Sequence, residues 1–495
     1  MIFSNLADYI EANSVRRAER LALVDPTREM RWSEFGPEML RTAAWLQDRG
    51  VRRGDIVGLT MRDGVDHAVM MIAIIRLGAI LLPMDPRWTS VEKDNVARVF
   101  GAAHAVTDAP DTCRLSTAQV ILHDPAAIAA TTRAPDLPAD FSADEPLLMS
   151  LSSGTTGTPK GPQLSHRQMM LRHYGEWLAL GFLADDVNLC STPLYFGGGR
   201  GFTLSYLLGG ATVVFCPPPY RPEDIAGLVD RYGVTTTFLV PTLLRRVSEA
   251  SPQVKASLRS LRFIICSGSA LHPSERRELL ETVNANLMNF YASTEGGGVA
   301  ILYGREGDEV ARSVGRPILG SQIRIIDNDD RELPAGEIGH IAHKAPWHPS
   351  GFHRNPDETA RYFRGGWYLP GDLGYLDAGG HLYITGRAKD MIIRGGVNIY
   401  PNEVEAVLVT HDAVSDAAVI GVPSEAFGEE VVAFVVADPA AVDAAALDAH
   451  CRASLASYKI PRDFHLVAEL PRNTGGKVVK PELVKRAEAL RREPA

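Results

Sequence analysis

Short apolar or β-branched runs alternate with longer segments of helical periodicity through the first three quarters of the chain. In one such unit, Ser33 can cap a helix that runs to Gly50, and residues 55–59 then predict a strand. The same order recurs between Pro222 and Cys266. Strands that alternate with helices in this way are typical of an α/β domain with substantial sheet content.

Two segments depart from this alternation. Residues 108–144 are rich in Ala, Asp, Pro and Thr, which predicts a loosely structured excursion before a strand at 146–151. After about Gly386 the chain becomes a compact series of strands and helices, with a helix expected at 401–410. Roughly 105 residues is enough for a small separate domain. The sequence therefore predicts a large N-terminal α/β domain with several sheets and a small α+β domain at the C-terminus.

The charge balance limits the classes of partner. The 495 residues include 51 Lys plus Arg and 60 Asp plus Glu, a formal net charge of −9 with no dense basic patch, so we expect no nucleic-acid partner. The most apolar stretch, 68–84, is interrupted by Arg76 and is too short to span a bilayer. The start does not resemble a signal peptide, and the five cysteines are widely spaced and never form a CxxC pair. We therefore expect a cytoplasmic protein.

The most informative segment is Leu151-Ser-Ser-Gly-Thr-Thr-Gly-Thr-Pro-Lys-Gly161, which lies between a predicted strand and a helix expected to begin near Ser165. Glycines let the backbone curl so that N–H groups converge, the hydroxyls add donors, and Lys160 adds a positive charge. Such a loop suits a polyphosphate, although it is not a Walker A loop because no GxxxxGK[ST] string is present. A flexible surface loop of similar composition is the alternative.

Further motifs follow this loop in a fixed order. They are Tyr291-Ala-Ser-Thr-Glu295, Gly336-Glu-Ile-Gly339, Tyr368-Leu-Pro-Gly-Asp-Leu-Gly374, Gly386-Arg-Ala-Lys-Asp390 leading into Gly395-Gly-Val-Asn-Ile-Tyr-Pro-Asn-Glu-Val-Glu405, and Pro471-Arg-Asn-Thr-Gly-Gly-Lys477. By these motifs the chain resembles the adenylate-forming superfamily of acyl-CoA synthetases, luciferase-like enzymes and peptide-synthetase adenylation domains. The resemblance implies a domain at 1–388 that binds ATP and the acid, and a mobile domain at 389–495 with its hinge at Lys389.

The resemblance also implies roles for single residues. The acid that matches Glu295 holds Mg²⁺ against the phosphates, Thr294 lies near the α-phosphate, and Tyr291 lies against the adenine. Asp372 accepts the ribose hydroxyls with help from Arg387, which could equally form a structural ion pair. The implied contacts to ATP and coenzyme A are Ser152, Ser153, Gly154, Thr155, Thr156, Gly157, Lys160, Gly268, Tyr291, Thr294, Asp372, Arg387, Gly395 and Gly396.

Two half-reactions follow from the resemblance. A substrate carboxylate attacks the α-phosphorus of ATP, Mg²⁺ and Lys160 offset the charge on the departing pyrophosphate, and Lys477 stabilises the carboxylate and α-phosphate. The small domain then turns about Lys389, a thiol attacks the mixed anhydride, and AMP leaves. The catalytic residues implied in this way are Lys477, Glu295, Thr294 and Lys160. A nucleotide-binding module without turnover is an alternative of a different class, against which these charged groups argue.

The string that begins with Gly395 and Gly396 bears on the thiol acceptor. It is similar to the CoA-ligase branch, in which paired glycines let a pantetheine arm pass close to the backbone. Peptide-synthetase domains more often show a single glycine there. The string therefore favours CoA, while a carrier-protein phosphopantetheine, which presents the same thiol, stays open.

Residues 191–201 correspond to one wall of the family's acyl pocket. Many members carry a His where this chain has Phe196, and the three glycines that follow suggest room for a flat or bulky apolar acyl group. Arg200 could pair with a second carboxylate of the substrate, or it could pin the loop or face water. The implied pocket residues are Tyr195, Phe196, Gly198, Gly199, Arg200 and Ser269. We therefore expect an acyl-CoA synthetase for an aromatic or medium-sized hydrophobic carboxylic acid; its oligomeric state is not readable from the sequence.

Overall fold

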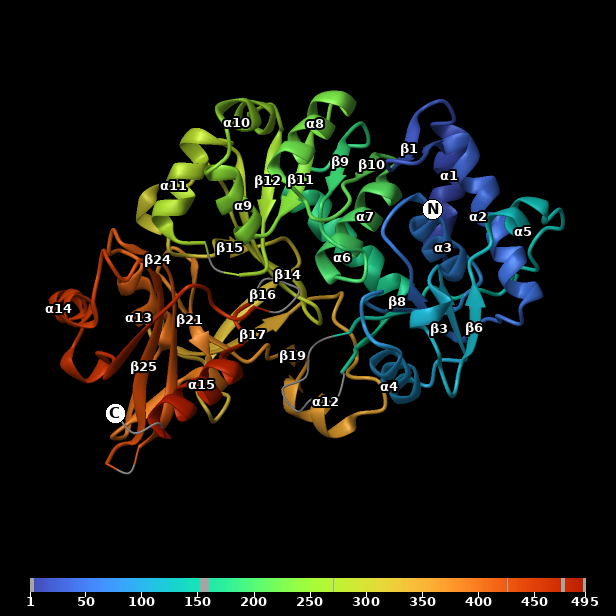
Figure 1. Cartoon of the computed structure of the whole chain (residues 1–495). Coiled ribbons are helices and arrows are strands. Elements are labelled where there is room, and N and C mark those ends of the chain that lie inside the picture. Colours follow the sequence, from blue (N-terminus) through green and yellow to red (C-terminus); the bar gives the residue numbers. More distant parts are fainter. Residues whose placement is uncertain (1–3, 152–159, 270, 425, 473–476, 493–495) are drawn as a thin grey trace.

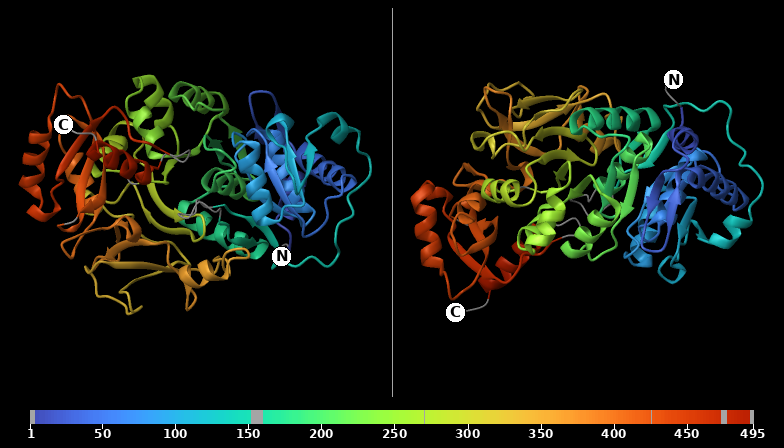
Figure 2. Two further views of the ribbon diagram at one scale, coloured as in Figure 1. Left: turned by 60° about the horizontal axis from the view of Figure 1, so that its bottom comes forward. Right: turned by 90° about the horizontal axis from the view of Figure 1, so that it is seen from above.

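The computed structural model describes residues 4–151, 160–269, 271–424, 426–472 and 477–492. Within these ranges the chain forms four sheets, one of which belongs to the C-terminal part. Figure 1 shows the first sheet (blue) and the C-terminal sheet (red) at opposite ends of the molecule, and the two views of Figure 2 agree with this arrangement. The expected α/β class is confirmed, with a large N-terminal domain of several sheets and a smaller C-terminal domain.

The first sheet has the strand order β6-β5-β3-β4-β7-β8 and is parallel except at β8. Its strands are β3 (Ile56–Thr60), β4 (Ile80–Pro83), β5 (His104–Thr107), β6 (Gln119–Leu122), β7 (Pro146–Met149) and β8 (Gln163–Ser165). The helices in this part of the chain are α1 (Ala7–Arg16), α2 (Trp32–Asp48), α3 (Val65–Arg76), α4 (Ser90–Phe100) and α5 (Pro125–Ala130). Helix α3 is buried along ten of its residues, which makes it the centre of this part of the core.

The second sheet has the order β15-β14-β13-β12-β11-β9-β10-β1-β2, with parallel strands from β13 to β1 and antiparallel pairs at both edges. Its strands are β1 (Leu21–Val24), β2 (Glu29–Arg31), β9 (Val187–Cys190), β10 (Thr212–Phe215), β11 (Thr236–Leu239), β12 (Phe263–Cys266), β13 (Leu287–Ser293), β14 (Gly297–Leu302) and β15 (Arg316–Pro317). Its helices are α6 (His166–Leu180), α7 (Gly197–Gly209), α8 (Pro222–Tyr232), α9 (Pro241–Ser248), α10 (Pro252–Arg259) and α11 (Pro273–Thr282). The carboxyl ends of its parallel strands meet at one edge, where α/β proteins commonly bind ligands.

The remaining two sheets are mostly antiparallel. The third sheet contains β16 (Gln322–Ile326), β17 (Gly339–Lys344), β18 (Phe363–Arg364), β19 (Trp367–Tyr368), β20 (Asp372–Leu376) and β21 (Leu382–Arg387), with α12 (Pro356–Tyr362) beside it. The C-terminal sheet contains β22 (Ile392–Arg394), β23 (Val397–Ile399), β24 (Val414–Ser424), β25 (Gly428–Ala437) and β26 (Asp463–Val467), with α13 (Pro401–Leu408), α14 (Ala444–Ser454) and α15 (Lys480–Arg492). Within the described residues no helix is both long and apolar enough to cross a membrane.

Two sequence expectations about local structure are wrong. Ser33 lies inside α2, because Arg31 occupies the N-cap position and its backbone N–H donates to the Glu34 carboxylate at 2.7 Å. The segment 108–144 is not merely loose: it contains β6 and α5, and β6 pairs in parallel with the whole of β5. Partners distant in the sequence supply this order, which the local composition did not indicate.

Candidate functional site

The Asp372 carboxylate is contacted by residues from two sheets. Asp372 begins β20 opposite Arg387, the last residue of β21, whose Nε lies 3.3 Å from one carboxylate oxygen. The Tyr291 hydroxyl, from β13 of the second sheet, donates to the other oxygen at 2.5 Å. Burial, followed by the Asp372 charge, raises the pKa of Tyr291 well above its ordinary value, so the phenol stays protonated as a donor. The structure brings together three residues that the sequence predicted for the nucleoside.

Lys477 reaches this site from the C-terminal domain. Its pKa is lowered by loss of hydration first and then by the positive charges of Arg387 and Lys389, while Asp372 and Glu295 pull in the opposite direction. Lys477 is nevertheless exposed to solvent. The predicted catalytic lysine therefore feels the charges of the predicted nucleotide site, although 90 residues separate Lys477 from Arg387.

Thr294 and Glu295 follow β13 at the carboxyl edge of the parallel strands. Their backbone is held by Arg172 of α6, which donates to the carbonyls of Thr294 at 3.3 Å and Glu295 at 2.9 Å. The Trp347 indole N–H donates to the next carbonyl, that of Gly296, at 2.8 Å. The sequence analysis missed Arg172 and Trp347, because neither lies in a glycine-rich or acidic motif.

Glu295 is the residue that the sequence predicts to bind Mg²⁺. Its carboxylate lies beside the Tyr368 hydroxyl, whose pKa is raised far above its ordinary value by burial first and then by the Glu295 charge. Mg²⁺ in nucleotide enzymes is usually bound by one or two carboxylates together with phosphates and water. In the described ranges no group of three or more His, Cys, Asp and Glu residues forms a cage. A single carboxylate beside the Lys477 ammonium has the donor chemistry for a phosphate-bound Mg²⁺.

Lys160 lies near the end of the predicted phosphate loop and contacts residues of α12. Its ammonium forms an ion pair with the Glu358 carboxylate and lies 5.3 Å from the centre of the Tyr362 ring. The Lys160 side chain is only 7% exposed. The other predicted loop contacts, Ser152, Ser153, Gly154, Thr155, Thr156 and Gly157, lie outside the described residues. Sequence reasoning missed Glu358, which is 198 positions from Lys160.

The predicted acyl-pocket wall follows β9 at the same edge of the second sheet. A side chain at Gly197 would come within 3.9 Å of the Thr294 hydroxyl, which places the start of α7 beside the predicted α-phosphate contact. A Cβ at Gly198 would lie 2.7 Å from the Phe238 ring, and one at Gly199 would lie 2.3 Å from a backbone carbonyl. Other atoms of the protein therefore occupy the space beside these two glycines. The expectation that they leave room for an acyl group is not supported at these positions.

Arg200 is 3% exposed and stabilises the predicted acyl-pocket wall through hydrogen bonds. It donates to the carbonyls of Leu194 at 3.2 Å and Tyr195 at 3.1 Å, and to the Ser150 hydroxyl at 3.2 Å. Burial, followed by the charge of Arg172, lowers its pKa to about 9. Of the alternatives left open by the sequence, these contacts are those of a residue that pins the loop.

The remaining predicted residues lie on turns. Gly268 and Ser269 follow β12 and are exposed, and Gly268 has a φ of +104°, which favours glycine. Gly395 and Gly396 form the turn between β22 and β23 with φ of +59° and +81°. Lys389 lies in the short 3₁₀ turn Ala388–Asp390 between the third sheet and the C-terminal sheet, and it is exposed.

Comparison with known proteins decides the family. The model of the AMP-binding enzyme family matches residues 10–353, and that of the AMP-binding enzyme C-terminal domain matches residues 403–477. The chain belongs to the AMP-binding enzyme family. It is thus an adenylate-forming enzyme, of the class of AMP-forming acid–thiol ligases.

Curated relatives of this AMP-binding enzyme match over nearly the whole chain. A 2-succinylbenzoate–CoA ligase of Geobacillus kaustophilus is 30% identical over 97% of this chain and 98% of its own length. A feruloyl-CoA synthase of Amycolatopsis sp is 30% identical over 92% of this chain and 93% of its own length. A fatty acid–[acyl-carrier-protein] ligase, ScoC of Streptomyces coeruleorubidus, is 28% identical over 92% of this chain and 91% of its own length.

Solved structures of one relative bear on the domain arrangement. ATP-bound MatB from Rhodopseudomonas palustris has a TM-score of 0.90 to this AMP-binding enzyme, at 29% identity and with 99% and 100% of the two chains covered. The apo structure of MatB, with the same identity and coverage, has a TM-score of 0.79. The whole chain therefore superposes better on the ATP-bound structure of this relative than on its apo structure.

Proposed function

We propose that this AMP-binding enzyme condenses a carboxylic acid with ATP to an acyl-adenylate and pyrophosphate, and then transfers the acyl group to the thiol of CoA with release of AMP. The observation that carries the proposal is the convergence of Lys477, from the small domain, on Asp372, Arg387 and Glu295 of the large one. Two positive groups and two carboxylates at one point suit a nucleotide whose phosphates are attacked by a carboxylate.

In the first half-reaction each of these groups has a distinct task. Asp372, fixed by Tyr291 and Arg387, offers carboxylate oxygens to the ribose hydroxyls. Lys477 offsets the charge that builds on the attacking carboxylate and the α-phosphate, and Lys160 offsets that on the departing pyrophosphate. Mg²⁺, held by Glu295 and the phosphates, would supply further charge neutralisation.

For the second half-reaction we propose that the boundary between the domains, 1–388 and 389–495, lies at Lys389. The support is local: β21 of the third sheet ends at Arg387, a short 3₁₀ turn follows, and β22 of the C-terminal sheet begins at Ile392. Backbone torsions at an exposed turn can change without loss of packing. Rotation there would move the Lys477 loop out of the site and bring the turn at Gly395 and Gly396 into it. A pantetheine arm can approach along this turn.

The acid is proposed to be aromatic or a medium-sized hydrophobe. Phe196 is the N-cap residue of α7 at the predicted pocket wall, and Phe202 of the same helix packs against Phe238 of β11 with ring centres 5.1 Å apart. Two relatives with matches over nearly the whole chain act, by their names, on aromatic acids. These observations support an apolar pocket suited to a flat ring.

Pyrophosphate release tests the proposal. The purified enzyme with ATP and Mg²⁺ is given benzoate, a cinnamate, hexanoate, acetate and phenylalanine in turn, with and without CoA. We expect the fastest release with the aromatic or six-carbon acids, and acyl-CoA and AMP as the products when CoA is present. Absence of acid-dependent pyrophosphate with every acid would favour a nucleotide-binding module without turnover.

The alternative acceptor is a carrier-protein thiol, which the relative ScoC uses by its name. It is separated from CoA by the same assay with a phosphopantetheinylated carrier protein in place of CoA. Acyl-adenylate that accumulates with CoA but is consumed by the carrier protein would favour this alternative. Turnover with CoA alone would exclude the need for a carrier.

A further inference from the structure

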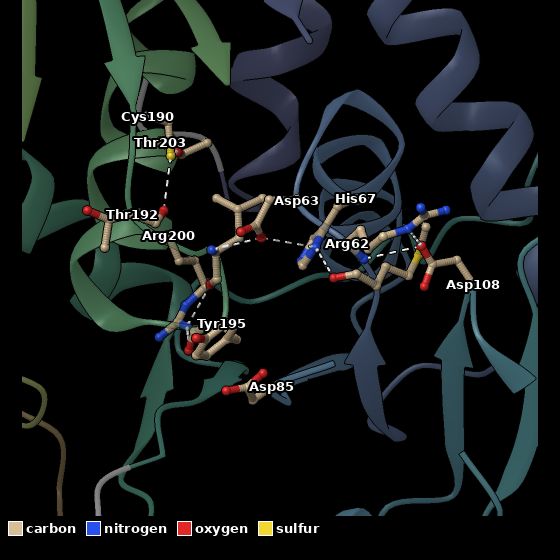
Figure 3. A network of polar contacts seen from close by, with 12 residues as sticks. Arg62, Asp63, His67, Asp85, Asp108, Cys190, Thr192, Tyr195, Arg200 and Thr203 are labelled. Atoms are coloured by element: carbon tan, nitrogen blue, oxygen red, sulfur yellow. Dashed lines mark hydrogen bonds and ion pairs between the residues drawn. The ribbon is translucent and has the colours of Figure 1, made fainter. Parts of the chain in front are cut away.

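The turn at residues 193–196, which leads into the proposed acyl-pocket wall, is held by side chains from other elements. The Asp63 carboxylate accepts the Leu194 N–H at 3.0 Å, and Arg200 donates to the carbonyls of Leu194 and Tyr195 (Figure 3). The Tyr195 hydroxyl is bonded to the Arg87 guanidinium, so Tyr195 is directed toward the loop after β4. Every polar group of Leu194 is thus engaged from outside the turn.

Asp63 reaches the turn from the loop between β3 and α3, in the first sheet. Its side chain is 17% exposed. Nδ1 of His67 lies 3.7 Å from Asp63 Oδ1 but only 3.1 Å from the Met61 carbonyl (Figure 3). Burial lowers the pKa of His67 to about 4, so this ring is neutral at pH 7 and offers Asp63 no charge.

The polar surroundings of Asp63 are unusual for an acid that serves only stability. Within the described ranges no Lys or Arg lies at ion-pair distance from it, and Arg87, whose charge acts on it, is paired with Asp85 at 2.7 Å. A half-enclosed carboxylate without a cation is costly to keep ionised, and an apolar side chain would fill the space at lower cost. What the carboxylate does gain is one charge-assisted hydrogen bond to the backbone of the turn.

We propose that Asp63 is a positioning residue that, through the Leu194 N–H, fixes the turn and with it Phe196 at the wall of the acyl pocket. The inference rests on the proposed function, since that function places the acid beside residues 191–201. Asp63 does not itself touch the acid. Its loss changes the binding of the acid and leaves the binding of ATP unaffected, because Asp372 and Lys160 lie on other elements.

The charge of Asp63 gives the proposal a pH signature. Burial raises the pKa of Asp63 to about 6, against the effect of the Leu194 N–H. The other titratable or charged groups that face it are His67, Asp85, Arg87, Cys190, Tyr195, Arg200 and Tyr220. Burial raises the pKa of the Cys190 thiol to about 12, and the pKa values of Arg87 and both tyrosines also lie far above neutrality. Protonation between pH 7 and pH 5 therefore acts chiefly at Asp63 and weakens its bond to the turn.

The experiment compares Asp63→Ala, which removes the acceptor, with Asp63→Asn, which keeps a neutral one. Steady-state pyrophosphate release gives separate KM values for the best acid and for ATP between pH 5 and pH 8. We expect Asp63→Ala to raise the KM for the acid about tenfold at pH 7.5, the effect of one lost hydrogen bond, with the KM for ATP unchanged. Asp63→Asn, which keeps an acceptor without the charge, should recover only part of the loss.

The pH profile separates positioning from a general loss of structure. For the wild type, the KM for the acid should rise as the pH falls through about 6, whereas for Asp63→Asn it should not rise beyond what the substrate's own titration causes in both proteins. Asp66→Asn, on α3 and paired with Arg28, is the matched control and should behave as the wild type. Should Asp63→Ala fail to fold, the comparison of wild type with Asp63→Asn still decides.

Three results would overturn the inference. One is an unchanged KM for the acid in Asp63→Ala with normal wild-type activity, which would leave the proposed function intact. Another is an equal rise of both KM values, the mark of a damaged fold. The third is the absence of acid-dependent pyrophosphate from the wild type, in which case the proposed function fails and the inference fails with it.

Discussion

Lys477 is the residue whose charge the first half-reaction most requires. The charges of Arg387, Asp372 and Glu295 act on its ammonium, and its pKa is lowered by loss of hydration first and then by Arg387. We predict that Lys477→Ala reduces acid-dependent pyrophosphate release by about a hundredfold to a thousandfold, the usual effect of losing one transition-state charge contact. Thioester formation from supplied acyl-adenylate and CoA should largely survive.

The two half-reactions are measured on the same preparations, with Lys485→Ala as control. Lys485 is exposed on α15, in the same domain, and its loss should change neither half-reaction. Equal loss of both half-reactions in Lys477→Ala would contradict the separate role of this lysine.

Phe196 carries the second prediction at the residue scale. It stands at the N-cap of α7, between the Tyr195 ring, at 6.4 Å between ring centres, and the glycines that pack against protein atoms. We predict that Phe196→Ala broadens the acid preference, with a several-fold fall in kcat/KM for the best acid and a rise for bulkier ones, and that Phe196→Leu is intermediate. Specificity constants over the acid panel provide the measurement. An unchanged profile would show that the pocket wall lies elsewhere.

Asp63 also has a predictable effect on stability. Its pKa in the folded protein, about 6, lies above its ordinary value of 3.8, so the folded protein loses stability as the pH rises through 6. The ionised form costs at most about 3 kcal/mol at neutral pH. Asp63→Asn should therefore raise the midpoint of thermal unfolding at pH 8 and change it little at pH 4, as measured by calorimetry. A lower midpoint at pH 8 would mean that the carboxylate stabilises the fold.

The charged groups of the motifs could be predicted from the sequence, whereas most of their partners could not. Asp372 and Arg387 lie in two successive motifs and pair across neighbouring strands. Glu358 meets Lys160 across 198 positions, and Asp63 meets Leu194 across 131. These partners belong to no motif, and the sequence does not distinguish them from other acidic residues. Only the folded chain identifies them.

At the scale of elements, helix ends were predicted where a local signal is complete. Helix α6 begins after Ser165, whose hydroxyl accepts the Gln168 N–H, and α8 begins at Pro222. At α2 the expected cap, Ser33, lies inside the helix, and Arg31, the last residue of β2, takes the N-cap position. Element boundaries therefore depend on packing even where the elements themselves are local.

Helix α12 controls the electrostatics of the phosphate loop. Its residues Glu358 and Tyr362 both contact the Lys160 ammonium. The ion pair of Lys160 and Glu358 therefore carries no net charge until phosphates compete for the lysine. We predict that Glu358→Gln strengthens pyrophosphate binding several-fold, because the largely buried Lys160 ammonium loses its counter-charge and gains from an anion beside it. The measurement is product inhibition by pyrophosphate. Asp357→Asn, exposed on the same helix, is the control, and weaker inhibition in Glu358→Gln would instead show that Glu358 holds Lys160 in place.

At the scale of the whole molecule, the net charge of −9 opposes the substrates, since ATP, CoA and the acid are all anions. Attraction must then come from a few local cations. Lys160, Arg387 and Lys477 were predicted for this task from the sequence, and the structure adds Arg172, which is half-buried and donates to the Glu295 carbonyl. The fold class and the domain order were readable from the sequence. The orientation of the small domain was not, because it depends on an interface that no motif records.

That interface allows a test of rotation. The ring of His272, at the start of α11, hydrogen-bonds to the backbone of Ala406 in α13, so the two domains touch beside the site. Cysteines at both positions, joined by a short bis-maleimide, would hold the arrangement that brings Lys477 to Asp372, and the five native cysteines are buried. We predict that the linked enzyme releases one equivalent of pyrophosphate and forms no acyl-CoA, whereas the unlinked double variant and each single variant treated with the same reagent turn over. Acyl-CoA formation at the normal rate by fully linked enzyme would show that the thiol reaches the adenylate without rotation, and Lys389 would then be an ordinary surface turn.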